Sequence, residues 1–126
     1  MFLRASMDVG QTPPIETREV KAGETVVLGE ALVLSGGVLT KCGATAKPAY
    51  IAVGPSVDGM AQVIKVHPHI VFDTILQAAG TNLKAGSKVT LYTDGLQVTA
   101  TTESGVATIV AMEGTAVGDH VQVRFE

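Results

Sequence analysis

The feature that most limits the fold of this chain is the alternation of apolar and polar residues in short runs. In residues 96–101 an apolar side chain stands at every second position, and residues 120–125 repeat the pattern. A period of two places successive side chains on opposite faces of a β-sheet, whereas a helix needs a period near 3.6. Fourteen glycines separate or flank such runs, and glycine accepts the positive φ angles of tight turns. The pattern predicts an all-β protein.

We expect about eight to ten short strands that close into one small, compact β-barrel or sandwich over residues 19–126. Residues 68–79 also fit a helix, with Pro68 in its first turn and Gly80 beyond its end. The many β-branched residues of this segment favour a strand instead. The other runs predicted as strands are residues 25–28, 31–34, 38–41, 49–53, 60–66, 88–93, 96–101, 106–112 and 120–125.

Glycine turns join these runs, and one turn sequence recurs. Residues 21–28 (KAGETVVL) match residues 84–91 (KAGSKVTL), and residues 117–123 (VGDHVQV) form a weaker third copy. In each copy the glycine suits a turn with positive φ, after which alternate side chains enter the sheet. The dipeptide Asp94-Gly95 predicts a different turn, the two-residue type I′ hairpin, in which both central residues have positive φ.

The first 18 residues differ from the rest and predict an extended N-terminal arm outside the folded domain. They lack periodicity, and the Pro-Pro pair within them holds the backbone extended. Such an arm either frays or docks on a partner through the apolar residues near its tip. The candidate contact residues of the arm are Phe2, Leu3, Arg4, Met7, Pro13 and Pro14.

Charge and composition exclude several classes of function. The formal net charge is −3 and no cluster of Lys or Arg is present, which argues against nucleic acid as a partner, since phosphate contacts need a basic face. No run has the apolar length of a signal peptide or a membrane span. We therefore expect a protein made in the cytoplasm, used without export and not bound to a membrane.

The stretch HPHIVFD carries the one pattern typical of metal chemistry. His67, His69 and Asp73 resemble the first motif of the cupin metal barrels, and two imidazoles with a carboxylate suit Fe(II), Mn or Zn. Cupins usually have glutamate where Asp73 stands and a third histidine on a later strand, whereas here His120 lies in a different setting. On a strand bent at Pro68, His67 and His69 would point away from the core. We favour two surface imidazoles and keep a cupin-like metal-binding enzyme or binder as the alternative.

The rest of the sequence shows no pattern typical of catalysis. It has no Gly-x-Ser-x-Gly motif and no phosphate-binding loop. Cys42, the single cysteine, stands at the end of an expected strand and is interpreted as a small buried side chain. The carboxylates, Glu30 and Asp94 among them, are interpreted as solvating groups. We expect no enzyme activity, no catalytic residue and no cofactor.

Residues 70–102 (IVFDTILQAAGTNLKAGSKVTLYTDGLQVTATT) are similar to small β-rich decoration, or cement, proteins of tailed-bacteriophage heads. The runs GVATIVAM and GDHVQVRF near the C-terminus belong to the same resemblance, which covers about residues 20–126. It implies a virion structural protein on the outer surface of the capsid, where it binds the major capsid protein and stabilises contacts between its subunits. A homo-oligomer is also implied, with a trimer favoured. His67 and His69 then join the arm residues as candidate capsid or subunit contacts, and a phage tail or baseplate domain is a further alternative.

Overall fold

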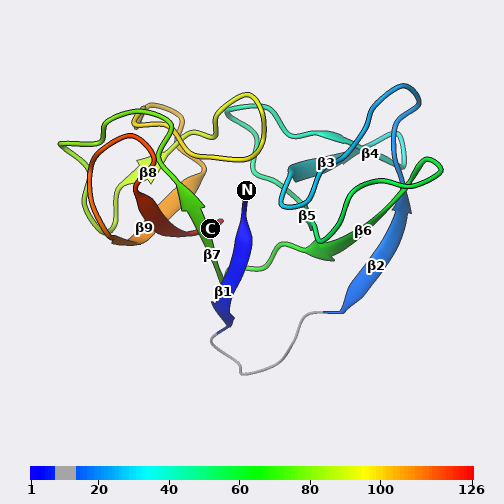
Figure 1. The fold of residues 1–126 in the computed structure, drawn as a ribbon, viewed down its shortest axis with the longest axis horizontal. Helices are drawn as coiled ribbons and strands as arrows, with labels where there is room; N and C mark the ends of the chain where they lie inside the picture. The colour runs from blue at the N-terminus through cyan, green and yellow to red at the C-terminus, as the bar shows by residue number, and fades with distance from the viewer. Residues whose placement is uncertain (8–13) are drawn as a thin grey trace.

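The computed structural model describes residues 1–7 and 14–126, which form ten β-strands and no helix (Figure 1). They build two antiparallel five-stranded sheets, sheet A in the order β1-β7-β10-β9-β8 and sheet B in the order β2-β6-β5-β3-β4. The prediction of an all-β protein with eight to ten short strands is confirmed. The strands are β1 (Leu3–Met7), β2 (Ile15–Glu19), β3 (Ala31–Ser35), β4 (Val38–Lys41), β5 (Tyr50–Ala52), β6 (Met60–Lys65), β7 (Ile70–Ile75), β8 (Lys88–Val89), β9 (Ala107–Met112) and β10 (His120–Arg124).

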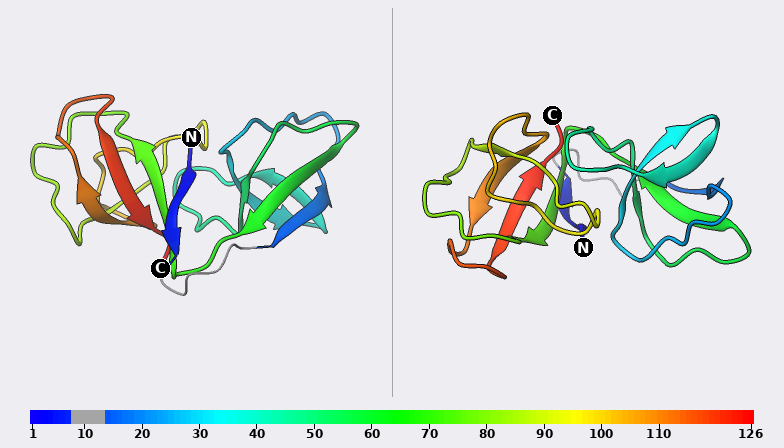
Figure 2. Two further views of the ribbon diagram at one scale, coloured as in Figure 1. Left: turned by 60° about the horizontal axis from the view of Figure 1, so that its bottom comes forward. Right: turned by 90° about the horizontal axis from the view of Figure 1, so that it is seen from above.

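Each sheet curls on itself, so that the molecule has two lobes side by side (Figure 2). In the sheet B lobe, Val20 follows β2 and makes a parallel bridge to Leu39 of β4, which brings the two edge strands together. In the sheet A lobe, Val98 bridges both Leu76 and Leu91, so the chain after β8 returns to the end of β7.

One apolar core runs through both lobes and joins them into a single unit. Ala31, Ile51 and Ile64 of sheet B belong to the same buried cluster as Phe72 and Val123 of sheet A. A second, smaller cluster lies on the opposite face of sheet B, so the central strands of this sheet bury successive residues. Burial on both faces explains the apolar residues 31–32 and 50–52, which lie in the buried parts of β3 and β5 and do not alternate.

The N-terminal segment belongs to this core, which corrects the expectation of an arm over residues 1–18. Phe2 is only 1% exposed, and its ring packs edge-on against Phe125 with 5.4 Å between centroids. Residues 3–7 pair with β7, and residues 15–19 pair with β6. An edge strand needs few apolar side chains, and β1 also has a register shift between Arg4 and Ser6, so neither strand shows an alternating pattern.

The other predicted strands fall close to their expected bounds, with a few exceptions. Residues 70–75 form a strand and not a helix, as predicted. The run 88–93 is reduced to the two residues of β8, while residues 25–28 and 96–101 form no strand. No helix long and apolar enough to cross a membrane occurs in residues 1–7 and 14–126.

The recurring glycine turn is present in all three copies. Each copy closes with a hydrogen bond from an amide to the carbonyl oxygen three residues earlier, and its glycine has a φ angle between +85° and +94°. The third residue after each glycine is a buried valine, so each copy brings the chain into the core at the same distance from its turn. The glycines are Gly23, Gly86 and Gly118, and the valines are Val26, Val89 and Val121.

The type I′ hairpin turn lies at the first Asp-Gly dipeptide of the chain and not at the second. Asp58 and Gly59 have φ angles of 52° and 75°. Val57 and Met60, on either side, exchange two backbone hydrogen bonds of 2.8 and 3.0 Å. These are the features of a two-residue turn whose twist matches that of the strands it joins.

The prediction of a type I′ turn at Asp94-Gly95 was wrong. Of the two residues, Gly95 alone has positive φ, and its amide donates to the carbonyl of Tyr92 at 3.0 Å. The Asp94 carboxylate accepts hydrogen bonds from the Leu96 amide at 2.8 Å and the Gln97 side chain at 2.9 Å. These side-chain bonds stabilise a longer loop, which the dipeptide by itself does not reveal.

Candidate functional site

The two histidines of the HPH stretch lie in a turn between β6 and β7 and not on a strand. The Ile70 amide donates to the His67 carbonyl at 3.0 Å, which closes the turn before β7 begins. Both side chains are exposed, and the rings of His67 and His69 stack with 4.8 Å between centroids. Pro68, between them, has no amide to offer a sheet, which fits a turn better than the bent strand that we expected.

Asp73 is directed toward a different histidine. Its Oδ2 lies 3.3 Å from Nδ1 of His120, on the neighbouring strand β10. The side chains expected to converge in a cupin-like site are therefore divided between a turn and the face of sheet A. In the ranges that the structure covers, no group of three or more His, Cys, Asp or Glu side chains is placed to hold a metal ion.

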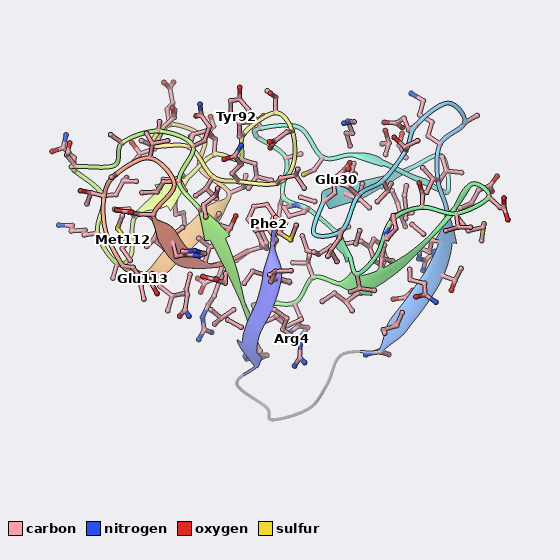
Figure 3. The ribbon with its side chains drawn as sticks, in the orientation of Figure 1. Phe2, Arg4, Glu30, Tyr92, Met112 and Glu113 are labelled. Atoms are coloured by element: carbon pink, nitrogen blue, oxygen red, sulfur yellow. The ribbon has the colours of Figure 1, made fainter. Side chains whose placement is uncertain are left out.

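The Asp73–His120 pair borders a shallow hollow of about 240 Å³ near the end of β9, where Figure 3 labels Met112 and Glu113. Both side chains of the pair are partly exposed, so water screens the contact between them. The lining residues are Asp73, Ala111, Met112, Glu113, His120, Val121 and Gln122. The arrangement offers one polar pair on an open strand face and no enclosed reaction site.

A more apolar groove of about 290 Å³ involves both lobes. Three of its residues have substantially exposed apolar side chains: Leu3 on β1 is 45% exposed, Ile15 on β2 is 61% exposed, and Leu28 is also exposed. Exposed apolar side chains that gather around one hollow are typical of contact surfaces. The lining residues are Phe2, Leu3, Arg4, Ile15, Leu28, Ile51, Ala52, Val53, Ile64 and Phe72.

The predicted contact residues of the N-terminus differ in how exposed they are. Phe2 is buried and is not available to a partner, whereas Leu3 and Arg4 are exposed and line the groove. Phe2 and Arg4 are labelled in Figure 3. Met7 is the last residue of β1 and pairs with Ile70. Pro14 is exposed, and Pro13 lies outside the described residues.

Cys42 is a buried thiol, as predicted from the sequence. Its Sγ donates a hydrogen bond to the Ala46 carbonyl at 2.9 Å. Burial raises the pKa of this thiol to about 11. Because the thiolate is the reactive form of cysteine, nearly all of this side chain is in the unreactive protonated form at neutral pH.

Glu30 is the residue that the sequence interpretation missed. It was expected among the solvating carboxylates, yet it is 2% exposed. Its Oε1 accepts a hydrogen bond from the Val27 amide at 3.2 Å, while Oε2 has no partner among the described residues. Glu30 stands directly before β3, in a stretch that reads as a turn, so its local sequence gave no sign of burial.

The fold defines this chain as a small all-β protein of two curled antiparallel sheets. Comparison with protein-family models and with curated proteins found no match to the sequence.

Proposed function

We propose that this protein is a non-enzymatic structural protein of a tailed-phage virion. It binds the major capsid protein on the outer surface of the head and stabilises contacts between capsid subunits. It is synthesised in the host cytoplasm and acts as a homo-oligomer, with a trimer favoured by the threefold points of an icosahedral head. The support from the sequence is the resemblance of residues 70–102 to head decoration proteins.

The structural observation that carries the proposal is the apolar groove with its exposed Leu3, Ile15 and Leu28. A partner that covers these side chains removes apolar surface from water, which favours binding by about 25 cal/mol per Å². A single contact of this size is weak. Repetition of the contact by a symmetric oligomer on a symmetric shell multiplies its effect through avidity.

The role of the N-terminus changes with the structure. Phe2 directly precedes the edge strand β1 and is buried in the core, whereas Leu3, the first residue of β1, is exposed. The proposed capsid contact is therefore a surface of the folded body and not a free arm. Removal of residues 1–14 would delete Phe2 and the whole of β1, so it would disturb folding and binding together. Point substitutions at the exposed groove positions separate the two effects.

Binding to undecorated heads of the phage that encodes the chain tests the proposal. We expect the wild type to co-sediment with heads, and Leu3→Ser and Ile15→Ser to bind about 5- to 30-fold more weakly, for a loss of about 1–2 kcal/mol each. Val117→Ser is the matched control, because Val117 is 65% exposed in the glycine turn before β10 and does not line the groove. It should bind like the wild type.

The possible results test two claims separately: that the protein decorates heads, and that the apolar groove is its contact surface. If the wild type does not bind heads, head decoration is rejected, and immunogold labelling of virions then tests the tail or baseplate alternative. If the wild type binds and all three variants bind equally well, the groove is rejected as the contact while decoration stands. The cupin-like alternative has lost its geometric basis, since Asp73 faces His120. Stoichiometric Fe, Mn or Zn in the purified protein would restore it.

A further inference from the structure

The two lobes are joined by backbone hydrogen bonds on both sides of one residue, Glu30. The Phe2 amide of the sheet A lobe donates to the carbonyl of Gly29 at 2.9 Å. The amide of Ala31 donates in the opposite direction, to the Gly95 carbonyl, also at 2.9 Å. Glu30 lies between Gly29 and Ala31, so its side chain belongs to the junction. Figure 3 labels it at the start of β3, beside the loop that carries Tyr92.

The side chain of Glu30 is enclosed at this junction. Gly95 of the opposite lobe passes close to it, since a Cβ atom added to Gly95 would lie 3.2 Å from Glu30 Cγ. One carboxyl oxygen is bonded to the Val27 amide, and the other has no partner in the described part of the chain. A carboxylate held away from water with one oxygen unsatisfied is costly to charge, whereas the protonated acid is much less so.

The charged groups around Glu30 do not remove this cost. Burial is the largest influence and raises the pKa of Glu30 above its ordinary value of 4.5. The Val27 hydrogen bond and the positive charge of Lys41 act to lower the pKa, while the negative charges of Glu24 and Asp94 act to raise it. The net effect is a pKa above 4.5, so folding favours the proton-bound form of Glu30 relative to the unfolded chain.

We propose that Glu30 is a proton-controlled contact between the two lobes. With its proton bound, Glu30 packs beneath Gly95 and the junction is closed. When the proton is lost, the charge draws water toward the side chain and the hydrogen bonds on either side of it open more often. The proposal is independent of head decoration, because the junction lies inside the protein.

The sign of the pH dependence follows from the direction of the pKa shift. Below the unfolded pKa near 4.5, Glu30 is protonated in the folded and unfolded states, and its burial carries no charge penalty. As the pH rises through the higher pKa of the folded state, the penalty develops fully and then stays constant. The junction is therefore tightest below about pH 4.5 and loosens as the pH rises above that value.

Amide hydrogen exchange measured by NMR between pH 5 and pH 8, corrected for intrinsic exchange rates, tests this. The reporters are the amides of Phe2 and Ala31, which cross the junction, and the references are Val53 and Ile109, which bond within one lobe. In the wild type we expect the reporters to lose protection relative to the references as the pH rises. In Glu30→Gln the ratio for Ala31 should be constant, with Ala31 better protected at pH 8 than in the wild type. Phe2 is the weaker reporter, because the N-terminal amine before it has a pKa lowered from 8.0 by burial and titrates in the same range.

Glu16→Gln is the matched control, because Glu16 is a partly exposed carboxylate paired with Arg18 on the outside of β2. It should keep the wild-type profile. A flat wild-type profile, or the same loss of protection in Glu30→Gln, overturns the proposal.

A second test needs no variant: the NMR chemical shift of the Glu30 carboxyl carbon is followed as the pH is changed. A titration midpoint above 4.5 supports the proposal, and a midpoint at or below 4.5 refutes it.

Discussion

Phe2→Ala is the substitution that most directly tests the role of the N-terminus in this fold. Phe2 is 1% exposed, and it lies in the same cluster as Phe72 and Phe125, the only other phenylalanines of the chain. Its ring packs edge-on against Phe125, and the Phe72 and Phe125 rings lie 5.6 Å apart. Removal of the Phe2 ring leaves a cavity at the boundary of the two lobes.

We expect Phe2→Ala to lower the free energy of unfolding by about 3–5 kcal/mol, as for other buried phenylalanines. At about 4 °C per kcal/mol for a domain of this size, the midpoint of thermal unfolding should fall by roughly 12–20 °C. The matched control is Leu3→Ala, at the next residue and the first of β1, which is 45% exposed. It removes a comparable apolar side chain from the surface and should cost about 1 kcal/mol or less.

Urea unfolding followed by far-ultraviolet circular dichroism measures both values, provided that the slopes of the two variants agree with that of the wild type. The decisive quantity is the difference between the variants. If Phe2→Ala and Leu3→Ala differ by less than about 1 kcal/mol, Phe2 is not a core residue in solution, and the placement of β1 against β7 is wrong.

Three further outcomes follow from local geometry. Gly59→Ala should destabilise the protein by about 1–2 kcal/mol in urea unfolding, because this glycine has a φ angle of 75°; Gly54→Ala, with open space around the added methyl group, should not. Asp94→Ala removes two hydrogen bonds from its loop and should cost about 1–2 kcal/mol by the same assay, and unchanged stability would contradict the structure of that loop. The Cys42 thiol, with its pKa raised by burial to about 11, should react with Ellman's reagent at pH 8 roughly 100-fold more slowly than in the urea-unfolded chain.

The parts of the fold that depend on neighbours in the sequence were predictable. Alternation located most strands, since the period of side chains along a strand is a local property. The recurring glycine turn also predicted local structure. The positive φ of its glycine and the burial of the third following residue both occur within one short segment. The buried valines after Gly23, Gly86 and Gly118 show that this short rule holds in three places.

The parts that depend on distant residues were not predictable. The two Asp-Gly dipeptides are identical, yet Asp58 takes positive φ between paired residues while Asp94 bonds to its own loop. Asp73 meets His120 only because β7 and β10 are neighbours in sheet A. Glu30 resembles any turn carboxylate until the opposite lobe covers it. In each case tertiary contacts decide between options that the local sequence leaves open.

The N-terminal strand shows why fold and proposed function have to be tested with different residues. From the sequence, Phe2, Leu3 and Arg4 form one set of candidate contact residues, because no alternation is visible in so short a segment. The structure divides them: Phe2 supports the core, while Leu3 and Arg4 face the groove. A variant of Phe2 that loses binding to heads therefore says nothing about the contact, since the groove itself depends on that side chain. Loss of binding in Leu3→Ser with unchanged stability is the result that assigns the surface.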